Sequence, residues 1–176
     1  MPQPSITRRK YHGQHFHPYQ HSSVRGPQYC EEKLALILKA AFAAPSAGNQ
    51  QPWEFYVVTN KSVLQALGKA SPYAMSAAYA PAALVICYRK DELRFPEYAE
   101  IDCAICTENV LLELESLGLG GVMLGIAPHE DRMKAVADAL MLPDDLAAFT
   151  IIPFGYPKNK QPQKDRYDGT KVHYKN

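Results

Sequence analysis

The order of patterns along this sequence predicts an α+β fold, in which a central mixed sheet is flanked by helices. Some segments carry apolar residues at helical spacing, and others carry alternating or unbroken apolar runs that are typical of strands. The chain has 176 residues, 47% of them apolar and 21% charged. This is enough to bury one full core, so we expect a single domain with tails.

The first regular elements are expected after a start that shows no sustained period. Apolar residues recur at helical spacing over Glu31–Ala44, and Pro45 stops that helix. A loop, Pro45–Pro52, leads to alternating residues that predict a strand over Trp53–Val58. A short helix over Ser62–Gly68 follows.

The centre of the fold is expected in the next two elements. Ala82–Tyr88 is apolar throughout, which predicts a central strand that is buried on both faces. The longest helix is expected from about Tyr98 to Leu117. It carries apolar residues on more than one face, so we place it in the core and against a second subunit.

The last third of the chain predicts three further elements. Gly118–Gly121 ends the long helix and leads into a strand, Val122–Ile126. A helix is expected between Pro128 and Pro143, and a last strand over Phe149–Tyr156. A locally basic tail follows.

Charge and motifs exclude several classes of function. The 19 basic and 18 acidic side chains leave a formal charge of +1, so no overall field attracts nucleic acid or an acidic membrane. No apolar run is long enough to cross a bilayer, and four cysteines suit a reducing compartment, so we expect a soluble, cytoplasmic protein. The GxGxxG, Walker, HExxH and GxSxG motifs are absent from the sequence.

The most informative segment is the loop that starts at Pro45. Its small residues allow the backbone to approach a flat ligand, and Asn49, Gln50 and Gln51 offer amides that donate and accept hydrogen bonds. From composition alone, a simple helix-to-strand turn bounded by prolines is the favoured alternative.

A family resemblance changes that balance. Residues Ala43–Trp53 resemble the APSxxNxQPW signature of the nitroreductase family of flavoproteins. The resemblance runs from about residue 22 to the C-terminus, and its ordered set of motifs is more specific than any one of them. The further motifs are Ser71–Ala74, Ala80–Pro81, Asp102–Cys103, Glu108–Asn109, Gly118–Gly121, Phe154–Pro157 and Val172–Tyr174.

The resemblance implies a nitroreductase-like fold with a mostly antiparallel central sheet, in an intertwined homodimer that holds two FMN sites. Residues 21–176 would form the FMN-binding domain, with a C-terminal tail from 157. Residues 1–20 would form an arm that is extended or disordered.

The same resemblance implies which residues contact the cofactor. One set lines the flavin, and the dimer brings most of it from the other subunit. That set is Pro45, Ser46, Ala47, Asn49 and Gln51. Gly125 and Ile126 would bring a backbone N–H to flavin N5, where a donor without an acidic proton suits a hydride acceptor.

Two basic segments are implied to hold the FMN phosphate and tune the flavin. His21–Arg25 resembles the family's RxSxR element, with His21 in place of the first arginine. Ser23 would donate to phosphate and Arg25 would lie by flavin N1 and O2, where negative charge develops on reduction. Arg8–Arg9 is an alternative, displaced start of this element.

Near the C-terminus, Lys164 and Arg166 resemble the family's KxR and would bind phosphate oxygens. A solvated basic tail is the alternative for this segment.

The implied activity is a ping-pong reaction. NADH or NADPH passes hydride to flavin N5 and leaves, and an acceptor such as a nitroaromatic or a quinone then takes its place. The flavin does the chemistry, so no catalytic side chain is expected. The alternative is a non-catalytic flavin-binding or flavin-less dimeric sensor or scaffold, which would not bleach a flavin with NAD(P)H.

For two clusters of cysteine and histidine residues we favour a structural explanation over a redox or metal site. Cys103 and Cys106 form a CxxC inside the long helix and are expected to be small buried residues rather than a redox pair. Four histidines of the arm could bind a transition metal, but an exposed or interface arm is favoured and no metal is expected. These are His12, His15, His17 and His21.

Overall fold

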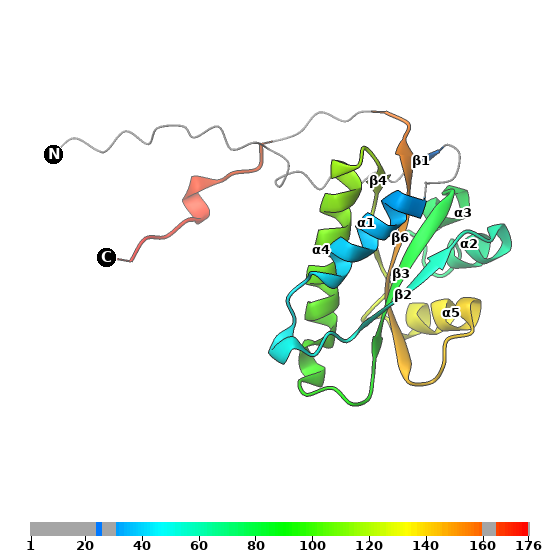
Figure 1. Ribbon diagram of the computed structural model, residues 1–176, viewed down its shortest axis with the longest axis horizontal. Coiled ribbons are helices and arrows are strands. Elements are labelled where there is room, and N and C mark those ends of the chain that lie inside the picture. Colours follow the sequence, from blue (N-terminus) through cyan, green and yellow to red (C-terminus); the bar gives the residue numbers. More distant parts are fainter. Residues whose placement is uncertain (1–23, 26–30, 160–164, 176) are drawn as a thin grey trace.

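The computed structural model describes residues 24–25, 31–159 and 165–175 (Figure 1). The expected arm over residues 1–20 lies outside this part of the chain, and so do its histidines and Arg8–Arg9. The expected site residues His21, Ser23 and Lys164 also lie outside it.

A six-stranded sheet forms the middle of the domain. Its central path runs β1-β6-β3-β2, and the short strands β4 and β5 pair with β6. Every pairing within the described residues is antiparallel, in keeping with a mostly antiparallel sheet. The strands are β1 Val24–Arg25, β2 Trp53–Val58, β3 Ala82–Arg89, β4 Gly120–Gly121, β5 Leu124–Gly125 and β6 Leu146–Pro157.

Helices cover both faces of this sheet (Figure 1). On one face lie α1, Glu31–Phe42, and α4, Ala99–Ser116. The other face carries α2, Lys61–Leu67, α3, Met75–Tyr79, and α5, Glu130–Leu140. The result is a three-layer α+β domain, as the sequence predicts.

Strand β3 is apolar from Ala82 to Tyr88 because both of its faces are covered by helices. Leu84 and Ile86 belong to the core beneath α1 and α4, whereas Val85 and Cys87 belong to the core on the other face. Side chains alternate across a strand, so only a strand between two helical layers needs apolar residues at every position. The prediction of a central strand is confirmed.

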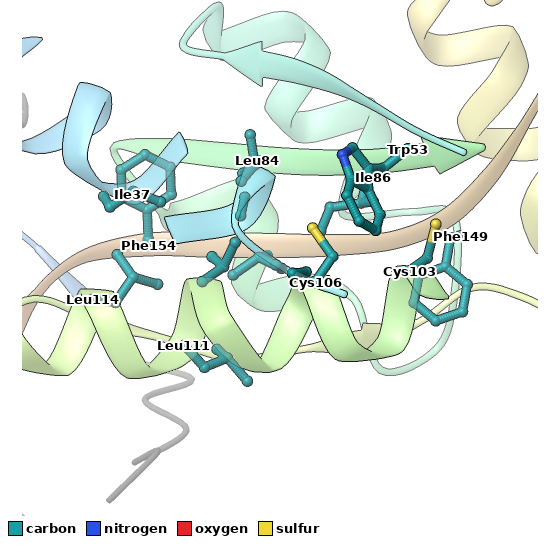
Figure 2. Close-up of a cluster of buried hydrophobic side chains, with 14 of the residues drawn as sticks. Ile37, Trp53, Leu84, Ile86, Cys103, Cys106, Leu111, Leu114, Phe149 and Phe154 are labelled. Carbon is teal, nitrogen blue, oxygen red and sulfur yellow. The ribbon is translucent and has the colours of Figure 1, made fainter. Parts of the chain in front are cut away.

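Figure 2 shows the first of these cores. The sulfur atoms of Cys103 and Cys106 lie on α4 among aliphatic and aromatic side chains that come from α1 and the sheet. Trp53 packs into the same core with only 3% of its surface exposed. The labelled residues are Ile37, Trp53, Leu84, Ile86, Cys103, Cys106, Leu111, Leu114, Phe149 and Phe154.

Each end of the long helix α4 lies within one residue of its predicted position. Its buried side includes Cys106, Val110 and Leu114, whereas Ile101 and Ile105 keep 53% and 38% of their surface exposed. An exposed apolar pair at i and i+4 lies on one face of the helix. Within the described residues no helix has the length and apolar character needed to cross a membrane.

Some short elements differ from the sequence prediction. Of the strand expected over Val122–Ile126 only β5, of two residues, is formed, and β4 lies before it, in the segment expected to be a turn; α3 was not predicted. Two-residue strands are too short to show a period of two, so their bounds depend on pairing with β6. A Cβ at Gly121 would lie 2.7 Å from Leu114 Cδ1, so a larger residue there would displace that side chain.

Candidate functional site

The loop between α1 and β2, residues 45–52, has an unusual backbone and is called here the 45–52 loop. Gly48, Asn49 and Gln51 have φ values of +56°, +57° and +46°. The left-handed region costs a non-glycine residue roughly 1–2 kcal/mol. At Gly48 a Cβ would in addition lie 2.6 Å from Phe95 Cε2. Such a loop needs strong contacts to keep its conformation.

A buried carboxylate supplies two of these contacts. Asp102, on α4, is only 2% exposed, and its Oδ1 accepts a hydrogen bond of 2.9 Å from the Ala47 N–H. Its Oδ2 accepts a bond of 2.7 Å from Gln50 Nε2. The Gln50 amide also donates to Phe95 O at 3.0 Å and accepts from the Phe95 N–H at 2.9 Å.

A cation binds the other side of the loop. Arg89, the last residue of β3, donates from Nη2 to the carbonyl oxygens of Gln50 and Gln51, at 3.2 and 3.3 Å. Its buried Nε has no hydrogen-bond partner among the described residues. The Gln51 N–H donates to Ser46 Oγ at 2.9 Å. The loop is therefore held by an anion at its N–H groups and by a cation at its carbonyls.

These contacts leave the other surface of the loop open. Gln50 turns inward, so its two neighbours, Asn49 and Gln51, present exposed side chains. Pro45 is also exposed, and Ser46 and Ala47 are half-buried. The loop residues expected to line a flavin therefore all keep accessible surface.

Gly125 and Ile126 lie at the end of β5 and directly after it. Gly125 is exposed, and no described atom lies within 4 Å of the place where its Cβ would be. Ile126 is fully buried, so of these two residues only Gly125 is accessible within the single chain. The Gly125 carbonyl accepts a bond of 3.1 Å from Arg132 Nη1, whose guanidinium lies 5.9 Å from the Tyr73 ring.

The two expected arginines belong to segments other than the 45–52 loop. Arg25 lies in β1, where its backbone pairs with Tyr156 of β6. Arg166 is exposed, in a segment over residues 165–175 that lies apart from the sheet and helices in Figure 1.

Burial makes the thiols of Cys103 and Cys106, on α4, unreactive. Burial raises the pKa of Cys106 to about 12, and it raises the pKa of Cys103 further, together with the charge of Cys106. A thiol that stays protonated is a poor nucleophile. In the part of the chain that the structure describes, no group of three or more His, Cys, Asp or Glu side chains could hold a metal ion.

Sequence reasoning did not select the residues that hold the loop. Gln50 stands between two predicted ligands but points the other way, and Arg89 resembles any charged residue at the end of a strand. Asp102 carried the clearest signal, because Asp102–Cys103 is one of the motifs on which the family resemblance rests.

Fold and site together define a three-layer α+β protein with an accessible loop between α1 and β2. The model of the nitroreductase family matches this chain over residues 30–91 and 72–156. A protein of Archaeoglobus fulgidus, provisionally named NADH dehydrogenase/NAD(P)H nitroreductase, is 37% identical over 150 residues, covering 83% of this chain and 86% of its own. The chain belongs to the nitroreductase family, and it is an oxidoreductase.

Solved structures agree with this assignment. A protein of Clostridium acetobutylicum, provisionally named NADH oxidase, superposes with a TM-score of 0.87 at 36% identity, covering 90% of this chain and 96% of its own. An FMN-dependent nitroreductase of Clostridium difficile superposes with a TM-score of 0.83 at 26% identity, covering 90% and 95%. The predicted nitroreductase-like fold is confirmed.

Proposed function

We propose that this protein is an FMN-dependent oxidoreductase that moves hydride from NADH or NADPH to a small acceptor, such as a nitroaromatic or a quinone, in ping-pong order. Bound FMN supplies the redox chemistry at its N5 atom. The observation that carries the proposal is the 45–52 loop, which Asp102 and Arg89 hold by hydrogen bonds and whose other residues stay accessible. The similarity to an FMN-dependent nitroreductase supports a flavin at this loop.

The residues of the chain fit a flavin. Pro45, Ser46, Ala47, Asn49 and Gln51 would line it, and each of them is exposed or half-buried. Gly125 adds open space over its Cα, which lets a planar ring approach the backbone of β5. The backbone N–H of Gly125 would donate toward N5, whereas Ile126, the other expected donor, is fully buried in the single chain. A backbone N–H holds a proton that does not ionise, so it orients and stabilises charge without acting as an acid.

The phosphate of FMN would be bound by basic side chains near both ends of the domain. Arg166 and Lys164 would supply a guanidinium and an ammonium, and Ser23 and His21 would add polar contacts. Arg25 would lie by N1 and O2. These roles stay proposals, as do the contacts of the lining residues.

We also propose that the active unit is a homodimer. Ile101 and Ile105 form an exposed apolar pair on α4, which a second copy would cover. The 165–175 segment lies apart from the sheet and helices of its own chain, so Arg166 would complete the site of the partner. A cytoplasmic location fits the three described cysteines, which are free thiols.

The visible absorption spectrum of the purified protein tests the proposal. We expect a bound flavin that is released as FMN on heating. Under anaerobic conditions NADH or NADPH should bleach it, and benzoquinone should restore it. A flavin that is bound but not bleached would support a non-catalytic binding protein. A colourless protein that takes up no added FMN would refute the proposal.

A further inference from the structure

The Asp102–Gln50 contact lies beneath the surface of the 45–52 loop rather than on it. We propose that Asp102 is a positioning residue for the flavin site, which acts through Gln50 and the Ala47 N–H to fix the 45–52 loop in its ligand-binding conformation. The inference rests on the proposed function, since it concerns the same loop.

The geometry of Gln50 decides where its neighbours point. Asn49 and Gln51 both have left-handed φ values, whereas Gln50, with φ of −72°, is right-handed and turned inward. Three hydrogen bonds of 2.7 to 3.0 Å fix its amide against Asp102 and Phe95. If the amide were released, the backbone could relax toward right-handed values, and the exposed side chains on either side would turn away from their present directions.

The contact also has only one satisfactory arrangement of donors and acceptors. The Gln50 NH₂ donates to Asp102 Oδ2 and Phe95 O, and its Oε1 accepts from the Phe95 N–H. Asp102 must therefore accept at both oxygens, because its Oδ1 already accepts from the Ala47 N–H. A carboxylate meets this requirement and a carboxamide does not, since one of its two ends is a donor.

The need for two acceptors makes Asp102→Asn the first test. Its amide group must face either the Ala47 N–H or the Gln50 NH₂, so that two donors meet and one of the bonds is lost. We expect FMN to bind roughly tenfold or more weakly, which corresponds to the loss of one hydrogen bond to a charged group. The absorption and visible circular dichroism of FMN, recorded at saturation, should also differ from those of the wild-type protein.

A paired substitution separates this contact from a general loss of stability. Gln50→Glu alone sets two carboxylates against each other at the same contact and should bind FMN more weakly than Asp102→Asn. In Asp102→Asn/Gln50→Glu the new amide can donate to the new carboxylate, which can still accept from the Phe95 N–H. The double variant should therefore bind FMN more tightly than Gln50→Glu alone, a sign of direct coupling.

Asp138→Asn is the matched control, because it also removes one carboxylate but breaks only an exposed pair with Lys134 on α5. Its FMN affinity and spectrum should equal those of the wild type. If Asp102→Asn does not fold, Gln50→Met tests the same contact, since it keeps the side-chain length without a donor or an acceptor.

The outcomes separate the two proposals. Wild-type protein that binds no FMN would overturn the proposed function and this inference together. Wild-type protein that binds FMN, with Asp102→Asn or Gln50→Met showing unchanged affinity and spectrum, would overturn the positioning role alone. A fall in the thermal midpoint of the ligand-free variant, with an unchanged flavin spectrum, would make Asp102 a purely structural residue.

Discussion

Gly48 is the position at which the loop tolerates a side chain least. Its φ is +56°, and a Cβ built on it would lie 2.6 Å from Cε2 and 3.1 Å from Cδ2 of the Phe95 ring. Gly48→Ala therefore meets two penalties, a left-handed backbone and a collision with an aromatic edge. Gly118 has the similar φ of +69°, with no described atom within 4 Å of its Cβ position. Gly118→Ala meets the first penalty only.

These two variants allow the collision to be measured by difference. The left-handed conformation costs alanine roughly 1–2 kcal/mol, and the reduced freedom of the unfolded chain returns about 0.4–1 kcal/mol to both variants. Displacing Phe95 adds about 1–3 kcal/mol to Gly48→Ala alone. We expect a total loss of about 1–4.6 kcal/mol for Gly48→Ala, against about 0–1.6 kcal/mol for Gly118→Ala.

Thermal unfolding of the ligand-free protein measures both changes. For a chain of this size, 1 kcal/mol lowers the midpoint by about 2–4 °C, so Gly48→Ala should lose roughly 2–18 °C. In a Phe95→Ala background the cost of Gly48→Ala should fall to that of Gly118→Ala, because the colliding ring is gone. Equal midpoints for Gly48→Ala and Gly118→Ala would refute the packing of Phe95 on the loop.

Two further predictions concern the core. Thr150 is fully buried, and its Oγ1 donates to Leu124 O at 2.8 Å; Thr150→Val should cost about 1–3 kcal/mol in urea unfolding, and an unchanged midpoint would contradict this role of the hydroxyl. Burial raises the pKa of Cys87 and Cys106 from 9.0 to about 12. Below pH 9 both thiols are protonated in the folded and in the unfolded protein. As the pH rises from 9 toward 12 they ionise only in the unfolded chain, so the free energy of unfolding should fall over this range. Cys106→Ala should reduce this slope, and an identical slope would show that the thiol is not involved.

Long patterns were predictable because many residues report the same environment. The strand over Ala82–Tyr88 and the helix over Tyr98–Leu117 lie within one residue of β3 and α4. Seven consecutive apolar residues require burial on both faces of a strand. A pattern that runs over eighteen residues of helix is long enough to show which side of the helix is buried. Both elements were therefore determined by local sequence and confirmed by packing.

Short elements and side-chain directions were less accessible. Strands β4 and β5 exist because β6 pairs with them, and this pairing is a long-range property that no window of sequence contains. The contact of Arg89 with the loop likewise joins residues that are 38 and 39 positions apart. The site could be located from its motif, but the residues that hold it required three-dimensional structure.

The adjacent glutamines show this limit most sharply and give a test of it. In the sequence Gln50 and Gln51 are equivalent amides, whereas in the structure the first is held by three side-chain bonds and the second is exposed. Gln50→Ala should cost about 2–3 kcal/mol in urea unfolding, because it leaves polar groups of Phe95 and Asp102 without partners. Gln51→Ala should stay within about 0.5 kcal/mol of the wild type. Equal losses would mean that the left-handed turns at residues 49 and 51 do not separate the two directions, and that the loop has another conformation in solution.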